Sequence, residues 1–144
     1  MNVYVALDDK NGMMFNYRRQ SQDIFLRKDI LDDSKGKTLW ISKYSAEQFY
    51  EDYSEGMPPN IRVDDEFFRK ASDEDNCFVE EYDLSFHLDK IKKLVIYRWN
   101  RRYPADFYFN IDLLDGTWKR AMIFDIKGNS HEKITKEVWV HELK

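Results

Sequence analysis

The sequence contains one cysteine, Cys77, among its 144 residues. An intramolecular disulfide and a cysteine-based zinc cluster are therefore excluded, and a reducing compartment is the natural setting. Because Cys77 is followed by the apolar residues Phe78 and Val79, we expect its thiol to be buried and unreactive.

Long apolar runs and an excess of positive charge are also missing. No stretch approaches the roughly 18 apolar residues of a membrane-spanning helix, and no basic segment leads into an apolar run and a cleavage site. The formal net charge is −4, whereas a protein that holds a nucleic-acid backbone needs a basic excess on one face. We therefore expect a cytoplasmic protein without a membrane or nucleic-acid partner.

The portable signatures of many enzyme classes are absent as well. There is no glycine-rich phosphate loop, no Gly-x-Gly-x-x-Gly and no Gly-x-Ser-x-Gly elbow. The three histidines, His87, His131 and His141, are scattered without the spacing of metal ligands. The sequence therefore predicts no metal site.

Glycine and proline are scarce, with five and three copies, while 42% of the residues are hydrophobic and 16% aromatic. This composition provides ample material for a core and leaves little sign of a disordered linker. A chain of this length suits one ordinary domain and is short for two. We therefore expect a single domain over residues 1–144.

Short apolar and β-branched runs alternate with segments of helical spacing. Strands are expected at residues 2–7, 38–41, 61–63, 77–79 and 94–97. The helical segments between them fall near residues 21–33, 45–53, 64–71 and 83–91. This alternation predicts parallel strands joined by right-handed crossovers, with the run at 94–97 buried at the centre.

The last third of the chain changes character. Strand-like runs at 107–109, 118–124 and 133–143 follow one another without helices, which predicts antiparallel strands that finish the sheet. Near the N-terminus, residues 13–20 are interpreted as a loop that could lie over a pocket, with the apolar anchors Met14, Phe15 and Tyr17 beside Arg18 and Arg19. The fold class is therefore α/β, a mostly parallel sheet flanked by helices with antiparallel C-terminal strands.

Four segments in this order resemble the dihydrofolate reductase family. Residues 2–14 are similar to its first strand and Asp-x-Asn-Gly turn, and residues 22–28 to the start of its first helix. Residues 37–45 resemble the second strand and the Gly-Arg-x-Thr turn that meets the cofactor. Residues 94–109 resemble a late strand, turn and Asp-x-x-Phe ending. The resemblance implies a dihydrofolate-reductase-like domain with a shortened middle.

The resemblance also implies roles for individual residues. Asp23 stands where the family places its pterin-binding carboxylate and would be the catalytic residue. Residues of the second turn would bind NADPH, and residues of the first loop and late strand would bind substrate. The implied cofactor-binding residues are Ser42, Lys43 and Ser45, and the implied substrate-binding residues are Arg18, Arg19 and Tyr97.

Several positions depart from the family pattern. The loop at 15–19 contains no Pro-Trp pair, and Tyr97 replaces a smaller threonine. Glu80 and Glu81 stand where a Gly-Gly pair lets the backbone approach the cofactor pyrophosphate. Two carboxylates at that place would repel phosphate and fill the space that glycine leaves open. NADPH-dependent reductase activity is therefore expected to be weak or lost.

Two alternatives remain open from the sequence. Asp23 can instead be a helix N-terminal acid that complements the helix dipole. Trp99, Arg101 and Arg102 form a cation and aromatic cluster that is either a solvated turn or a contact for a protein partner. The first hypothesis is a cleft that binds a nucleotide or pterin-like molecule, and the alternative is a non-catalytic interaction domain on the same scaffold.

Overall fold

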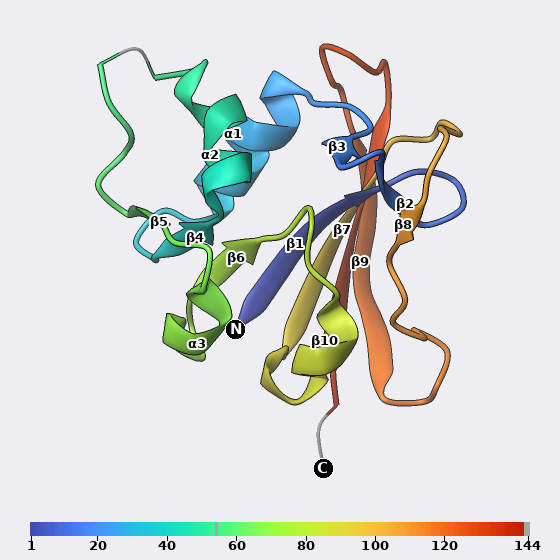
Figure 1. The fold of residues 1–144 in the computed structure, drawn as a ribbon. Coiled ribbons are helices and arrows are strands. Elements are labelled where there is room, and N and C mark those ends of the chain that lie inside the picture. The colour runs from blue at the N-terminus through green and yellow to red at the C-terminus, as the bar shows by residue number, and fades with distance from the viewer. Residues whose placement is uncertain (54, 143–144) are drawn as a thin grey trace.

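The largest sheet has seven strands in the order β5-β4-β6-β1-β7-β10-β9 (Figure 1). It belongs to a computed structural model that describes residues 1–53 and 55–142. β1 (Asn2–Leu7) lies between β6 (Asn76–Phe78) and β7 (Lys93–Arg98) and is parallel to both. The run at 94–97 is therefore a central strand, as the sequence predicts.

The two sides of the sheet differ in strand direction. On one side, β4 (Leu39–Ile41) and β5 (Ile61–Val63) continue the parallel order. On the other side, β10 (Ile134–His141) runs antiparallel to β7, and β9 (Trp118–Ile126) runs antiparallel to β10. This arrangement confirms the predicted α/β fold class with antiparallel C-terminal strands.

Both faces of the central strands are buried, which explains their continuous apolar sequence. Val3 and Val5 of β1 point into one core cluster, and Tyr4 points into another on the opposite face. α1 (Ile24–Asp33) and α2 (Lys43–Tyr50) contribute to the cluster around Tyr4.

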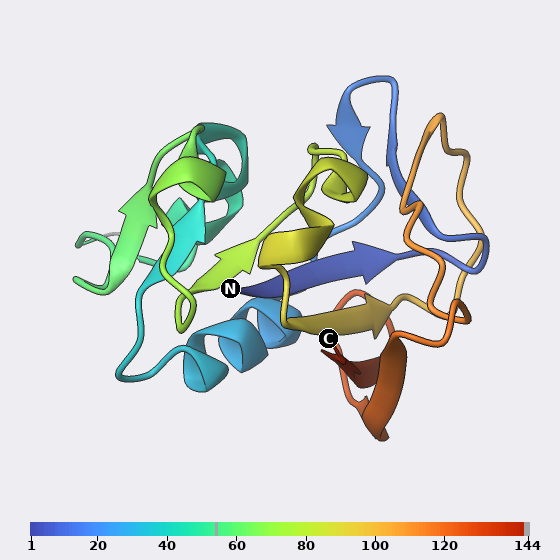
Figure 2. The ribbon, with the colours of Figure 1, turned by 90° about the horizontal axis from the view of Figure 1, so that it is seen from below.

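The opposite cluster receives α3 (Phe67–Lys70) and η1 (Leu84–Lys90). Figure 2 shows α1 and η1 on opposite sides of β1. The helix expected near residues 83–91 is a 3₁₀ helix, which is more tightly wound than an α-helix. No described helix has both the length and the apolar composition needed to cross a membrane.

Two sequence-based expectations about the N-terminal loop and the aromatic strand are wrong. Residues 13–20 form a hairpin of β2 (Gly12–Phe15) and β3 (Arg18–Arg19) instead of a loop. Its turn residues Asn16 and Tyr17 both have positive φ, 51° and 61°, as two-residue hairpin turns require. β8 (Phe107–Tyr108) pairs with β2 in this second, three-stranded sheet and does not finish the main one.

Cys77 is fully buried in β6. Burial raises the pKa of its thiol to about 12, so the thiolate is scarce at neutral pH. The expectation of an unreactive cysteine agrees with this environment.

Candidate functional site

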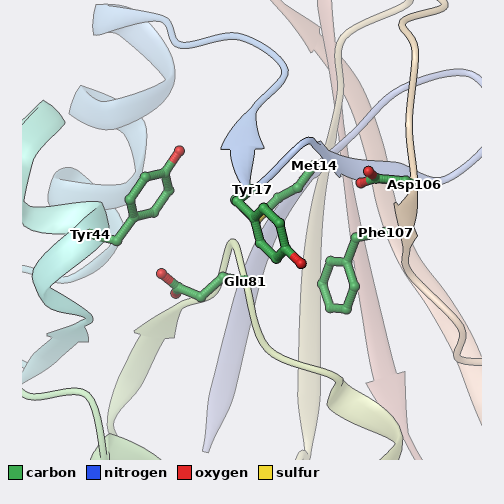
Figure 3. Close-up of a pocket in the computed structure, with 6 residues that line it drawn as sticks. All are labelled: Met14, Tyr17, Tyr44, Glu81, Asp106 and Phe107. Carbon is green, nitrogen blue, oxygen red and sulfur yellow. The ribbon is translucent and has the colours of Figure 1, made fainter.

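A pocket of about 620 Å³ lies where the carboxyl ends of β4 and β6 approach the small sheet. Ligand sites of open α/β sheets favour this edge, and the volume is within the usual range for small-molecule sites. Figure 3 shows Glu81 between Tyr44 on one side and Tyr17 with Phe107 on the other. The lining residues are Met14, Tyr17, Tyr44, Glu81, Asp106 and Phe107.

Tyr44 is held in place from both its chain neighbours and the hairpin. Ser42 is the N-cap of α2, and its Oγ accepts a hydrogen bond from the Ser45 backbone N–H at 3.1 Å, which places Tyr44 in the first turn. The Tyr44 hydroxyl accepts from the Arg19 backbone N–H at 2.7 Å. The Arg19 guanidinium lies 4.3 Å from the Tyr44 ring centre, so the hairpin and α2 form one wall.

The tip of the hairpin is anchored on the opposite side of the pocket. The Asp106 carboxylate accepts from the Asn16 backbone N–H at 3.1 and 3.3 Å. The Asp106 backbone N–H donates to the Met14 carbonyl at 3.0 Å. Tyr17 at the tip is 92% exposed. The pocket therefore has an aromatic side chain at its mouth that has little packing to hold it.

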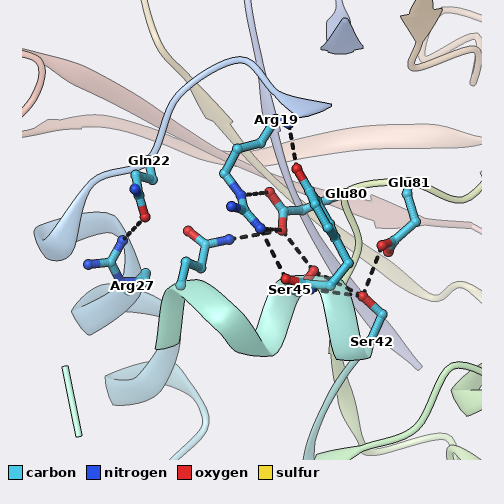
Figure 4. A network of polar contacts seen from close by, with 9 residues as sticks. Arg19, Gln22, Arg27, Ser42, Ser45, Glu80 and Glu81 are labelled. Carbon is cyan, nitrogen blue, oxygen red and sulfur yellow. Dashed lines mark hydrogen bonds and ion pairs between the residues drawn. The ribbon is translucent and has the colours of Figure 1, made fainter. Parts of the chain in front are cut away.

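Glu80 is a buried carboxylate whose acceptor positions are filled by the protein (Figure 4). Arg19 donates to it through Nε at 3.0 Å and Nη2 at 3.3 Å. Ser45 Oγ donates at 2.8 Å and Gln48 Nε2 at 2.9 Å. Because Glu80 is paired with Arg19 and accepts four hydrogen bonds, it ties the hairpin to α2 and has little capacity left for a ligand.

Glu81, the next residue, has the opposite environment. Its Oε2 accepts one hydrogen bond, from Ser42 Oγ at 3.0 Å, and its buried Oε1 has no partner among the described residues. Burial raises the pKa of the Glu81 carboxyl to about 7, and the negative charge of Glu80 adds to the shift. A carboxyl with this pKa can donate or accept a proton near neutral pH.

Two serines connect the two glutamates. Ser45 Oγ donates its proton to Glu80, and Ser42 Oγ lies 3.3 Å from Ser45 Oγ and 3.0 Å from Glu81. Ser42 has a single hydroxyl proton, which can point to only one of these two neighbours. When Glu81 is protonated, it can donate to Ser42 while Ser42 donates to Ser45. The protonation of Glu81 therefore sets the direction in which the Ser42 hydroxyl donates.

Asp23 lies outside this pocket and is saturated with hydrogen bonds. It is the N-cap of α1, and its Oδ1 accepts from the backbone N–H groups of Phe25 and Leu26 at 2.9 and 3.2 Å. Its Oδ2 accepts from the backbone of Asn129 and from the backbone and hydroxyl of Ser130 at 2.8 to 2.9 Å. Burial opposes ionisation, but the Ser130, Leu26 and Phe25 bonds prevail and lower the pKa of Asp23. These contacts match the helix N-terminal alternative, and the catalytic role of Asp23 stays a prediction.

The other residues implied by the resemblance divide into two groups. Ser42, Ser45 and Arg19 meet in the network around the two glutamates. Tyr97 is fully buried, and its hydroxyl donates to Asp29 of α1 at 2.5 Å. It therefore does not line the pocket.

The side chains of Arg18 and Lys43 are exposed. Neither cation is among the pocket-lining residues. Both lie next in sequence to pocket residues, Tyr17 and Tyr44.

In the cluster of Trp99, Arg101 and Arg102, the tryptophan is buried and the two arginines are exposed. Trp99 is 3% exposed and stacks on His131, with ring centres 4.6 Å apart. Its ring is therefore not available as a surface anchor, which corrects that part of the protein-partner prediction. Arg101 and Arg102 are exposed, as a solvated turn requires.

Sequence reasoning missed the central residue of the pocket. Glu81 was recognised only as an obstacle to phosphate, because the strand register decides whether Glu80 or Glu81 faces the cleft. Tyr44 carried a usable signal, since it lies three residues after the end of β4. Phe107 begins β8 of the small sheet, so its place at the pocket depends on tertiary pairing. Of the residues in 13–20 that were expected over a pocket, Met14 and Tyr17 line it, whereas Phe15, Arg18 and Arg19 are not among its lining residues.

No group of three or more metal-ligating side chains is close enough to hold an ion in residues 1–53 and 55–142. No protein-family model matches the chain, and no curated protein matches it in sequence. Among solved structures, the fold is similar to dihydrofolate reductase from Enterococcus faecalis complexed with NADP(H) and RAB-propyl. The TM-score is 0.66 at 11% identity, over 99% of this chain and 96% of that one. The chain therefore has a dihydrofolate-reductase-like fold, and the identity is too low to extend the likeness further.

Proposed function

We propose that the chain binds a flat, nitrogen-containing heterocycle of the pterin or nucleobase kind in this pocket, with Glu81 as the recognising carboxyl. The observation that carries the proposal is the raised pKa of Glu81, about 7, together with its unpartnered Oε1 beside aromatic walls. Protein carboxyls in such surroundings gather at functional sites.

The chemistry of the pocket selects the ligand class. An amino-substituted ring with an adjacent ring N–H presents two parallel donors, which a carboxylate accepts as a pair. Tyr44, Tyr17 and Phe107 offer aromatic faces on which a flat ring can stack. Glu81 Oε1 is buried without a partner, so the ring would reach it after the Glu81 side chain turns toward the pocket, and would then supply the hydrogen bond that Oε1 lacks. A cationic or neutral ring is favoured because Glu81 and Asp106 are the charged groups in the lining.

The residues present do not fit the pyrophosphate of NADPH at the start of α2. The Lys43 backbone N–H donates to the Asp65 carboxylate at 2.9 Å, and the Ser45 backbone N–H donates to Ser42 Oγ. The Ser45 hydroxyl is committed to Glu80. A phosphate at this helix end would meet occupied donors and carboxylates. We therefore propose that NADPH-dependent reductase activity is lost.

Arg18 and Lys43 complete the proposal at the rim of the pocket. Both side chains are exposed, and each neighbours a lining residue in sequence. They would meet an anionic substituent on the ring, such as the phosphate of a mononucleotide. Their contribution would be sensitive to salt, whereas that of Glu81 would not.

Thermal-shift titration of the whole chain with pterin, guanosine, dihydrofolate, NADP and NADPH tests the proposal. A ligand at one hundred times its dissociation constant stabilises a fold by about 2.7 kcal/mol. We expect at least one of pterin, guanosine and dihydrofolate to stabilise the protein, and NADPH and NADP to have no effect. Glu81→Gln should weaken that binding at least tenfold, because the amide keeps one acceptor oxygen and replaces the other with an NH₂ group, which cannot accept a hydrogen bond from the ring.

Glu47→Gln is the matched control, since Glu47 lies on the exposed side of α2. It should bind as the unaltered chain does. The proposal is wrong if no heterocycle stabilises the fold, or if Glu81→Gln binds the ring with unchanged affinity. Stabilisation by NADPH would restore the cofactor role of α2.

A further inference from the structure

The edge strand β9 has an exposure pattern that neither the fold nor the pocket explains. β9 is the last strand of the main sheet and pairs with β10. Its residues 119–125 are all exposed. Three consecutive members of this run are large and apolar, with Met122 54%, Ile123 50% and Phe124 40% exposed. Successive side chains alternate between faces, so apolar surface is exposed on both sides of the same edge.

Edge strands of soluble proteins are usually short, or protected by proline, inward charges or bulges. β9 has nine residues and no proline. Its protective features lie toward its ends: the charged residues Lys119, Arg120 and Asp125, and a bulge. Met122 pairs with Val138 while Arg120 pairs with Trp139, which leaves Ala121 as the extra residue. The run from Met122 to Ile126 lies beyond this bulge and pairs regularly with β10.

The outward backbone groups of this run have no partner in the described part of the chain. The backbone hydrogen bonds outside strand ladders include none from β9. Figure 1 shows β9 and β10 as a long antiparallel ribbon at the side of the sheet away from β5. The edge therefore offers hydrogen-bond donors and acceptors together with apolar side chains.

We propose that a second copy of this chain adds to the edge, with β9 of one copy antiparallel to β9 of the other. The charges of the strand favour this occupant and this direction. Lys119 and Arg120 stand at the start of the strand and Asp125 near its end. In an antiparallel pair, the basic end of each copy faces the acidic end of its partner, while a parallel pair would align like charges. The bulge at Ala121 bends the basic end, so long side chains rather than backbone make the contact there.

Such a pair is a closed, two-fold arrangement that would join two seven-stranded sheets edge to edge. It would cover the edge-facing parts of Met122, Ile123 and Phe124 in both copies. Phe124 already has one neighbour, with the Lys136 Nζ 5.6 Å from its ring centre. The proposal is independent of the pocket, because none of its residues lines that site.

Sedimentation of the whole chain over about 1 µM to about 1 mM tests this inference. We expect a monomer and dimer equilibrium. Ile123→Lys places a charge on the apolar edge and should weaken the dimer at least tenfold. Leu114→Lys is the matched control, because Leu114 is 89% exposed outside β9, and it should leave the equilibrium unchanged.

A charge exchange tests the direction of pairing. Lys119→Asp should weaken the dimer by placing two acids together, and adding Asp125→Lys should restore it. These variants also decide the question if Ile123→Lys does not fold. A chain that is monomeric throughout the range overturns the proposal. The proposal is also wrong if Ile123→Lys or Lys119→Asp leaves the dimer intact. It is wrong as well if adding Asp125→Lys to Lys119→Asp does not restore the dimer.

Discussion

Asp23 and Glu81 are two carboxyl groups in buried surroundings whose environments differ in almost every respect. Asp23 accepts five hydrogen bonds, two from the first turn of α1 and three from Asn129 and Ser130. Glu81 accepts one, from Ser42, and has one oxygen without a partner among the described residues. The pKa of Asp23 is therefore lowered, while burial raises that of Glu81 to about 7.

The two carboxyl groups differ in how far the protein itself satisfies them. Asp23 joins the start of α1 to the turn between β9 and β10, and a ligand would have to displace existing bonds to reach it. Glu81 has unused acceptor capacity next to a pocket. The family resemblance made Asp23 the candidate in the sequence, whereas the hydrogen bonds leave Glu81 as the carboxyl with an oxygen that has no partner among the described residues, which is why we propose it.

Removing Asp23 should have the largest effect on stability. Asp23→Ala removes the acceptor of five hydrogen bonds, two of them from the first turn of α1, and should lower the free energy of unfolding by about 3 kcal/mol. Urea denaturation measures this loss. Asp32→Ala is the control, because Asp32 is exposed and pairs with Lys35 on the surface, and it should change stability little. A loss for Asp23→Ala no larger than for the control would contradict the structural role.

Neutralising Glu81 should change the stability less than removing Asp23 does, and should raise it. The pKa of the Glu81 carboxyl is about 7 in the folded protein and about 4.3 in the unfolded chain. Its contribution to the free energy of unfolding is therefore present at low pH and is lost as pH rises from the lower value to the higher one. Glu81→Gln should therefore stabilise the protein at pH 8 by about 1 to 2 kcal/mol, after allowance for solvent screening.

The same variant should match the unaltered chain near pH 4. The difference between the two denaturation curves, measured from pH 4 to pH 8, isolates this one group. An equal stability at both ends of the range would show that Glu81 is not perturbed.

Tyr44→Phe should cost about 1 kcal/mol, because the hydroxyl accepts from the Arg19 backbone N–H and its loss leaves that donor without its partner. The substitution keeps the aromatic face beside Glu81. Unfolding free energy measures the loss, and ring binding should be nearly retained. A large loss of ligand affinity with unchanged stability would instead give the hydroxyl a direct role in binding.

Asp23→Asn should change how stability depends on pH, and only in the acidic range. Since the folded pKa of Asp23 is lowered, its stabilisation is present above the unfolded value of about 3.9 and is lost as pH falls below it. The Asn variant should lose less stability than the unaltered chain on acidification below pH 4. Parallel acid curves for the two proteins would contradict the lowered pKa.

Much of the sheet follows from its sequence pattern. The continuous apolar runs of β1 and β7 predict strands buried on both faces, and the helical segments between strands predict parallel order. The hairpin at residues 13–20 was missed because its turn depends on positive φ at Asn16 and Tyr17, and tyrosine seldom signals this conformation. The pairing of Phe107 with β2 depends on tertiary contacts and cannot be predicted from the local sequence pattern.

The candidate site was predictable only in part. The family resemblance brought forward Ser42, Ser45 and Arg19, which do meet around the glutamates. It did not reveal that Glu80 would be paired and Glu81 unpaired. That outcome depends on which of the two adjacent residues after β6 faces the pocket. It also depends on the position of Arg19 in the β2–β3 hairpin, which the sequence did not predict.

Carbon-13 NMR titration of the side-chain carboxyls, without ligand and with the heterocycle that binds, tests the central claim most directly. We expect Glu81 to titrate near pH 7 and to shift when the ring binds, while Asp23 titrates below its ordinary range and does not shift. If Glu81 titrates like a free glutamate, or if the ligand perturbs Asp23 and leaves Glu81 unchanged, the assignment of the pocket to Glu81 is wrong.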